Sequence, residues 1–325
     1  ADEARAVAVI LRWVLNQSDK TACFVTPDRR LAERVAAIMR RWQVEIDDSA
    51  GVPLSQTPVG RFITQSLRAF HEQSAVSLLS LLRMPLTNLG RPRGEVKRLT
   101  ALLEDKVLRG PKIHGGWAAL LDAISNNEKM EEAEKTDLID LMQDIKAAFS
   151  PLDERGDERA GMLFREGCER AVMAVEALAA GEEKSGAELL WVNDDGRAAA
   201  QMLVQVLNEL PAAYDRTILY PDLVEGMQAL MSVVTVRPRY TLHPRIQILS
   251  PTEARLQQTD IMILSGLNEG TWPVSSRNDP WMSRSMRRDF GLPDIEHQIG
   301  LSAHDFSQHI CAPVVYLTRA RSVEG

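Results

Sequence analysis

The sequence predicts an α/β protein whose parallel sheet is interrupted by a large, all-helical insertion. Strand-like and helical segments alternate near both ends of the chain, as in parallel sheets with crossover helices. Between residues 58 and 185, leucine- and alanine-rich segments with helical spacing replace this alternation. We therefore expect a discontinuous α/β domain of residues 1–57 and 186–325, and a helical insertion subdomain of residues 58–185.

The first part of the domain has a helix–strand–helix–strand pattern. Residues 4–15 carry apolar side chains at helical spacing, and residues 21–25 are typical of a short buried strand. Thr26-Pro27-Asp28 ends this strand and opens a second helix that reaches Trp42. Residues 44–46 are the next expected strand.

The insertion contains no segment that we expect to form a strand. After it, residues 195–209 have helical spacing, and residues 217–220 predict a strand that ends at Pro221-Asp222. Three further strands are expected at residues 246–249, 260–264 and 314–317.

The amino-acid composition excludes a disordered chain and a membrane-spanning one. The 325 residues include 45 acidic and 38 basic side chains, a formal charge of −7, and 45% hydrophobic residues, which excludes a mostly disordered chain. No stretch has the roughly 18 uninterrupted apolar residues that a membrane span needs. The three cysteines lie far apart, which argues against a disulfide framework, so we expect a cytoplasmic protein without membrane contact.

Both ends of the sequence are typical of a fragment. The chain begins within a helical pattern without an initiator methionine, and it closes just after a strand-like run. It has no G-x-x-x-x-G-K-[ST] phosphate loop, no H-E-x-x-H motif and no nucleophile elbow. We therefore assign no catalytic residue, no metal ligand and no cofactor to this stretch, and expect no ATP hydrolysis or nuclease activity from it alone.

Two segments place polar residues directly after strands. Asn268 and Glu269 follow the strand at 260–264, where Gly266 and Gly270 permit tight turns, and ligands of open α/β sheets bind at such strand ends. Arg319 and Arg321 follow the strand at 314–317 and could meet a phosphate or carboxylate. An ordinary strand-ending turn and surface arginines are the alternative interpretation.

Charge is segregated along the chain. Arg237, Arg239 and Arg245 occur without an intervening acid, whereas residues 128–144 are strongly acidic. The second helix also carries several basic residues: Arg29, Arg30, Arg34, Arg40 and Arg41. Binding to a phosphate backbone requires a local surplus of this kind rather than a basic total, although ordinary solvated helix faces give the same pattern.

Several strings, read in order, resemble the AddB subunit of bacterial AddAB helicase–nucleases. The similarity covers residues 21–62 and 237–321 and is weak through the helical middle. It is carried by these strings: Val25-Thr26-Pro27-Asp28-Arg29, residues 44–51, residues 248–260, Gly266-Leu267-Asn268-Glu269-Gly270-Thr271-Trp272-Pro273, residues 279–284, residues 286–293, and Gly300-Leu301-Ser302-Ala303-His304-Asp305-Phe306.

The resemblance implies a RecA-like (P-loop NTPase-type) second motor lobe, as in UvrD/Rep-type helicases, in a complex that processes broken DNA ends for recombinational repair. It implies an AddA-type helicase–nuclease subunit and DNA as partners. Glu269 would contact a nucleotide sugar and Arg319 the γ-phosphate, with ATP and Mg²⁺ bound only in the full protein. An iron–sulfur cluster would belong to a nuclease domain outside this stretch.

The sequence also departs from active helicases. Residues 250–257 lack the His and the Lys-Gly pair of a Thr-x-His-x-x-Lys-Gly-Leu-Glu-Phe segment. We therefore expect a catalytically degenerate, DNA-binding or scaffolding lobe, with Arg237, Arg239, Arg245 and Arg255 lining one surface near the carboxyl ends of the strands. The alternatives are one lobe of an active ATP-dependent motor and a purely structural module that docks a partner.

Overall fold

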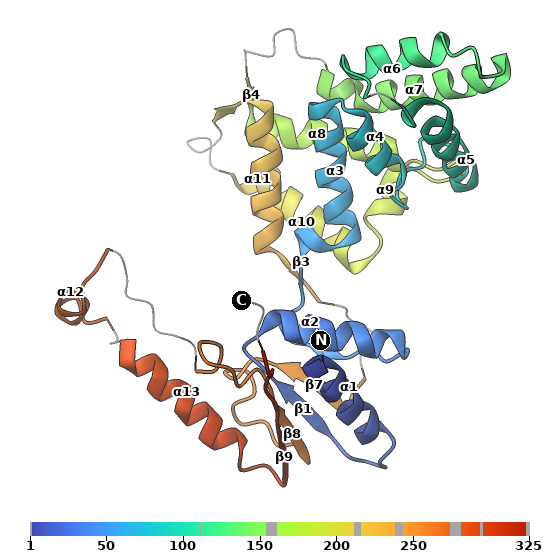
Figure 1. Cartoon of the computed structure of the whole chain (residues 1–325). Coiled ribbons are helices and arrows are strands. Elements are labelled where there is room, and N and C mark those ends of the chain that lie inside the picture. Colours follow the sequence, from blue (N-terminus) through green and yellow to red (C-terminus); the bar gives the residue numbers. More distant parts are fainter. Residues whose placement is uncertain are drawn as a thin grey trace. The chain divides into compact units, whose positions relative to one another are not determined.

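The chain folds into two compact units (Figure 1). A computed structural model describes residues 2–110, 112–153, 161–210, 216–237, 243–273, 281–292 and 295–322. The α/β unit comprises Ala1–Gly51 and Arg237–Gly325, and the helical unit comprises Val52–Val236. The expected architecture, a sheet domain assembled from both ends of the chain and divided by a helical insertion, is confirmed.

A five-stranded parallel sheet forms the centre of the α/β unit. Phe24 on the middle strand is level with Ile248 on one side and Ile263 on the other. All neighbouring strands in this sheet are parallel. The strand order is β2 (Asp47–Asp48), β7 (Ile246–Leu249), β1 (Ala22–Val25), β8 (Ile261–Leu264) and β9 (Val314–Leu317).

Alternating side chains of the central strands enter two different hydrophobic clusters. Ala22 and Phe24 pack with α1 (Asp2–Leu15) and α2 (Arg29–Arg41) on one face. Cys23 and Val25 pack on the other face with Trp272 and α13 (Ile295–His309). Burial on both faces explains why these strands are continuously apolar instead of alternating between polar and apolar residues.

The two helices on the first face form where the sequence predicts, although α1 begins at Asp2, before the predicted start at residue 4. On α1, the residues at helical spacing (Ala4, Val7, Ala8, Leu11 and Val14) are buried. At the start of α2, the Asp28 side chain accepts hydrogen bonds from the backbone N–H groups of Arg30 and Leu31 over 2.9 and 3.2 Å. This cap satisfies donors that the first helical turn leaves free.

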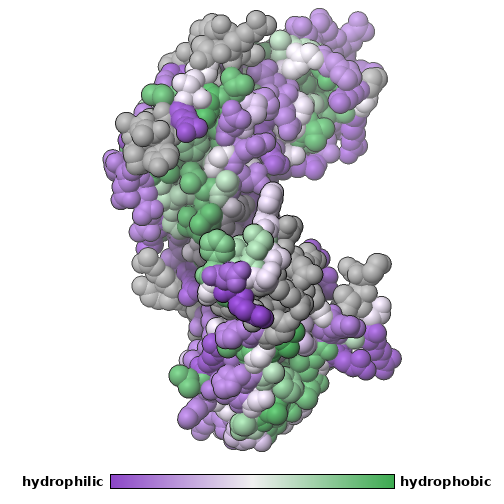
Figure 2. Space-filling view, turned by 90° about the vertical axis from the view of Figure 1, so that its left-hand side faces the viewer, coloured by the Kyte–Doolittle hydropathy of each residue, from purple (hydrophilic) through white to green (hydrophobic). Residues whose placement is uncertain are grey.

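The second face is covered less completely. The short helix α12 (Arg284–Asp289) precedes α13. Exposed apolar side chains include Ile299 and Leu301 on α13, Ile310 just after it, and Val314 and Leu317 on β9. Figure 2 shows hydrophobic residues gathered toward the lower end of this unit. β9 is the edge strand of the sheet, so its exposed side chains lie at an open edge.

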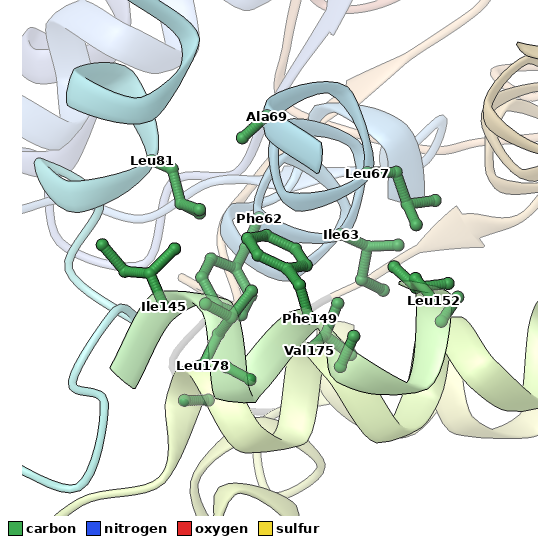
Figure 3. Packing of buried hydrophobic residues seen from close by; sticks show 14 of the residues in the cluster. Phe62, Ile63, Leu67, Ala69, Leu81, Ile145, Phe149, Leu152, Val175 and Leu178 are labelled. Atoms are coloured by element: carbon green, nitrogen blue, oxygen red, sulfur yellow. The ribbon is translucent and has the colours of Figure 1, made fainter. Parts of the chain in front are cut away.

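The helical unit has its own extensive core. Phe62, Phe149 and Leu178 meet at its centre, contributed by three different helices (Figure 3). Its helices are η1 (Leu54–Gln56), α3 (Pro58–Glu72), α4 (Ala75–Leu82), α5 (Arg93–Leu103), the π-helix η2 (Glu104–Leu108), α6 (Gly116–Ser125), α7 (Glu132–Asp153), α8 (Phe164–Ala179), α9 (Gly186–Leu190), α10 (Asp194–Glu209) and α11 (Tyr220–Val233).

Two small antiparallel strand pairs complete the helical unit. β3 (Val52–Pro53) pairs with β6 (Thr235–Val236), and β4 (Met162–Leu163) pairs with β5 (Thr217–Ile218). The insertion was expected to contain no strand, so β4 is a correction. Within the described ranges, no helix is both long and apolar enough to cross a bilayer.

The boundaries between the units differ from those that the sequence predicts. The segment 186–236 belongs to the helical unit instead of the sheet domain, and so do residues 52–57. The reason is packing: Leu203 of α10 and Met227 of α11 are buried in the core of the helical unit. Likewise, the strand expected at 217–220 shortens to 217–218, because Tyr220 begins α11 and donates from its hydroxyl to the Leu67 carbonyl over 3.1 Å.

Candidate ligand-facing edge of the sheet

The segments that follow β8 and β9 lie together at the carboxyl edge of the sheet. The Leu267 N–H donates to the Thr318 carbonyl over 3.3 Å. Further along both segments, the Ala320 N–H donates to Oδ1 of Asn268 over 3.1 Å. These two hydrogen bonds hold both segments in one register beyond the end of the strands.

The first turn of α1 braces the same edge. Oε1 of Glu3 accepts hydrogen bonds from the Gly266 N–H over 2.9 Å and from the Thr318 hydroxyl over 2.8 Å. Gly266 has a φ of 74°, and a Cβ there would lie 3.1 Å from Oγ1 of Thr26. The positive φ therefore favours glycine, and the Thr26 hydroxyl just after β1 leaves little room for a side chain.

Glu269 and Arg319 both reach solvent at this edge. They follow neighbouring parallel strands, so their expected placement on one edge is confirmed. Both side chains are exposed, and Arg319 forms no ion pair with any residue that the structure describes. An exposed guanidinium without its own carboxylate is available to an anion, whereas contact with a nucleotide stays a prediction.

Polar groups within residues 250–257, the segment that lacks the active-helicase residues, form hydrogen bonds with each other. The Ser250 N–H donates to Oε2 of Glu253 over 3.0 Å, and the Glu253 N–H donates back to the Ser250 hydroxyl over 3.3 Å. The Ser49 hydroxyl also donates to Oε2 of Glu253, over 2.6 Å. Burial raises the pKa of Glu253, but these hydrogen bonds outweigh it and hold the pKa below its ordinary value. The Ser-x-x-Glu spacing is a capping-box signature that sequence inspection could have found.

Arg255 fastens the same segment to α13. Its guanidinium donates to both carboxylate oxygens of Asp305, over 2.6 and 3.0 Å. Asp305 is only 4% exposed, so water hardly reaches its carboxylate. The ion pair with Arg255 is therefore partly buried. The same hydrogen bonds raise the pKa of Arg255. The guanidinium of Arg255 therefore has a structural role, because it links residues 250–257 to α13.

Arg245 lies at the other edge of the sheet. It immediately precedes β7, whereas Arg255 follows that strand, so the prediction that both line one surface is wrong. The Arg245 guanidinium donates to carbonyls at the end of α1, those of Leu15 over 3.1 Å and Gln17 over 2.7 Å. It caps carbonyls that the last helical turn leaves free. Arg237 is exposed and lowers the pKa of nearby Glu253, while Arg239 lies outside the described residues.

The amino edge also carries an ion pair and a groove. Lys20 donates to Asp260 over 2.7 Å, and the Thr21 N–H and hydroxyl donate to the other oxygen over 3.0 and 2.9 Å. A groove of about 760 Å³ runs beside this pair, with Gln257, Gln258 and Gln308 in its lining. Glu269 and Arg319 are not among the residues that line it.

The described residues contain no group of three or more His, Cys, Asp or Glu side chains that could hold a metal ion. Cys23 and Cys168 are buried, and Cys311 is exposed. Burial raises the pKa of Cys23 to about 12, which keeps its thiol protonated.

A bound nucleotide fits this edge only in part. Glu269 and Arg319 offer a carboxylate and a guanidinium to solvent, but the sequence holds no phosphate loop to cradle a triphosphate. The hydrogen bonds of Asn268 and Glu3 hold the edge in a defined shape. The sequence alone did not indicate these contacts. Comparison of the sequence with protein families and with curated proteins finds no significant match to either.

Proposed function

We propose that this chain is a helicase-like lobe of the AddB type, working in a complex that processes DNA ends for double-strand break repair by homologous recombination. The observation that carries the proposal is the carboxyl edge, where Asn268 and Ala320 tie together the segments that present Glu269 and Arg319. A parallel sheet covered by helices on both faces is compatible with a RecA-like second motor lobe.

The proposed lobe is catalytically degenerate. In the AddB-like segment 250–257, the polar groups of Ser250 and Glu253 bond to each other, and Arg255 is held by Asp305. These groups thus have hydrogen-bond partners within the fold. This arrangement supports a gripping or scaffolding role over ATP-driven translocation.

A second candidate function is one half of an active motor. The exposure of Arg319 favours it, because an arginine at a strand end can stabilise charge on a transferring phosphoryl group. In that case, a phosphate-loop lobe supplied by the complete protein would hold ATP and Mg²⁺, and Arg319 would reach the γ-phosphate. The two candidates differ in whether Arg319→Ala abolishes ATP hydrolysis by the complete protein.

Complex formation tests the proposal. The chain is mixed with an AddA-type helicase–nuclease subunit and a blunt-ended duplex, and the mixture is separated by size. We expect the chain to elute with the subunit and the DNA. A partner-docking module would elute with the subunit and leave the affinity for the DNA end unchanged. Elution of the chain by itself at micromolar concentrations would contradict all of these functions.

A further inference from the structure

The outer surface of α1 and α2 combines arginines with tryptophans. The two helices pack against each other on the same face of the sheet. Their exposed side chains include six arginines and two tryptophans: Arg5, Arg12, Arg30, Arg34, Arg40, Arg41, Trp13 and Trp42. We call this set the basic aromatic face. We propose that it binds single-stranded nucleic acid, with the arginines on phosphates and the tryptophans stacked on bases.

The arginines of this face outnumber the acids of the two helices that carry them. None of the six arginines forms an ion pair with a residue in the described part of the chain. The two helices carry three acids, and one of these, Glu3, is engaged with Gly266 and Thr318. In a chain of net charge −7, such a cluster is a local surplus that a polyanion would recognise.

Helix stability does not account for all of these arginines. Cations near a helix C-terminus are favoured by the helix dipole, which is sufficient reason for Arg12, Arg40 and Arg41. The first turn of α2, however, contains no acid, and Arg30 there opposes the dipole. Its neighbour Arg29 is explained by an ion pair with Asp48 over 2.8 Å, whereas Arg30 has no partner among the described residues.

The tryptophans lie at the same end of the two helices. α1 starts at the carboxyl edge, where Glu3 bonds to Gly266, and ends near Arg245 at the amino edge. α2 follows β1 and therefore runs in the same direction. Trp13 near the end of α1 is 46% exposed, and Trp42 at the end of α2 is 39% exposed.

Exposed indole rings among arginines that form no ion pair with a described residue point to a single strand. Unpaired bases stack on aromatic side chains, and the backbone is held by nearby cations, a combination that tolerates any sequence. In a duplex the faces of the bases are occupied by their neighbours, so the tryptophans would add nothing. On α1, Val9 is 58% exposed and lies one turn before Trp13, which extends the apolar platform between Arg5 and Arg12.

Fluorescence anisotropy of labelled oligomers tests the inference with the whole chain. The probes are oligothymidylate and oligouridylate of about 16 nucleotides, the upper site size of a common single-strand-binding fold, and a duplex of equal length. We expect Trp13→Ala and Trp42→Ala each to weaken binding to the single strands by about tenfold, while Trp→Phe at either position retains most of it. A preference for one single strand identifies whether the natural ligand is DNA or RNA.

Charge variants provide the second readout. Arg34→Ala and Arg41→Ala should each reduce the slope of log affinity against log salt by about 0.7, the value for one phosphate contact on a single strand. Matched controls are Arg61→Ala on α3 and Trp281→Ala, whose indole is 87% exposed outside this face. Tryptophan fluorescence should fall on binding, and this fall should be lost in the Trp13→Ala/Trp42→Ala double variant.

Equal binding of wild type and the tryptophan variants would overturn the inference, as would equal loss in the controls or tighter binding to the duplex. Capture of an acidic protein in place of nucleic acid would also overturn it. The inference rests on α1 and α2 and not on the carboxyl edge, so it can fail while the proposed function stands. Conversely, the variants should leave elution with an AddA-type subunit unchanged in the absence of DNA.

Discussion

Oδ1 of Asn268 accepts a hydrogen bond from the backbone N–H of Ala320 over 3.1 Å, joining two segments that lie 52 positions apart in the sequence. Because Glu269 and Arg319 each adjoin one partner of this bond, the bond fixes the backbone from which both side chains extend. Glu3 adds a second brace through Gly266 and Thr318. The carboxyl edge of the sheet is therefore a defined structure and not the end of two independent loops.

Asn268→Ala should loosen this edge. The variant removes the acceptor of the Ala320 N–H, so we expect the Ala320 amide to exchange with solvent faster, with a loss of about 1 kcal/mol in stability. Hydrogen exchange resolved to single amides measures this. Glu269→Ala is the matched control: its exposed side chain makes no hydrogen bond to a described residue, and the Ala320 amide should keep its protection.

The Arg255–Asp305 pair should respond asymmetrically to truncation. Arg255→Ala leaves a carboxylate that is 4% exposed without its partner, so we expect this variant to lower the free energy of unfolding, by less than the loss of a fully buried pair because Arg255 itself is partly solvated. Asp305→Ala should cost less, since the arginine can turn to water. Urea unfolding of both variants checks the order, and equal costs would show that the pair does not fasten α13.

The Asp260 carboxylate predicts a pH dependence. A hydrogen bond from Lys20, followed by those from Thr21, lowers the pKa of Asp260 to about 2. With an unfolded pKa of about 3.9, this group stabilises the folded state above that pH, and its contribution is lost as the pH falls toward 2. Asp260→Asn should therefore lower stability at neutral pH and flatten the decline between about pH 4 and 2.

Urea unfolding across this pH range provides the measurement. Asp289→Asn serves as its control, because that carboxylate is exposed at the end of α12 and has no partner among the described residues. If the Asp260→Asn and Asp289→Asn proteins lost stability in parallel with wild type as the pH fell, the ion pair would not contribute to folding.

Two glycines in the helical unit should respond in opposite directions to the same substitution. A Cβ on Gly60 of α3 would lie 1.9 Å from the Leu54 carbonyl oxygen, so Gly60→Ala must displace η1 and should cost about 2 kcal/mol or more. A Cβ on Gly94 of α5 meets nothing within 4 Å, and Gly94→Ala should stabilise the helix by up to about 1 kcal/mol. Thermal unfolding of the two variants separates them. If both variants lost stability, the close approach of the Leu54 carbonyl would not be the reason for the loss in Gly60→Ala.

The strands and helices of the α/β unit could be predicted well because their signals are local. The apolar run 261–264 is fully buried, the strand 246–249 is buried apart from the half-buried Gln247, and the Asp28 cap fixes the start of α2. The second strand was expected at 44–46, but Val44 and Ile46 pack beneath α2, and pairing with β7 begins only at Asp47.

The limits of the units were harder to predict because they depend on packing partners that are distant in sequence. α10 resembles a sheet-covering helix in its spacing, yet its Met202 and Leu203 are buried in the helical core.

The roles of the basic residues also depend on partners that are distant in sequence. Arg245 and Arg255 look alike in the sequence, and only the structure shows that one caps α1 while the other binds Asp305.

Hydrogen exchange in the presence of Mg²⁺ and ATP tests the central claim, that the edge bearing Glu269 and Arg319 faces a nucleotide. In the complete protein, which supplies the rest of the proposed nucleotide site, we expect slower exchange in residues 266–270 and 318–321 at millimolar nucleotide. Arg319→Ala should abolish this protection, whereas Arg321→Ala, which removes another exposed arginine two positions away, should retain it. Unchanged exchange in both segments at saturating nucleotide, or equal protection in wild type and Arg319→Ala, would contradict the claim.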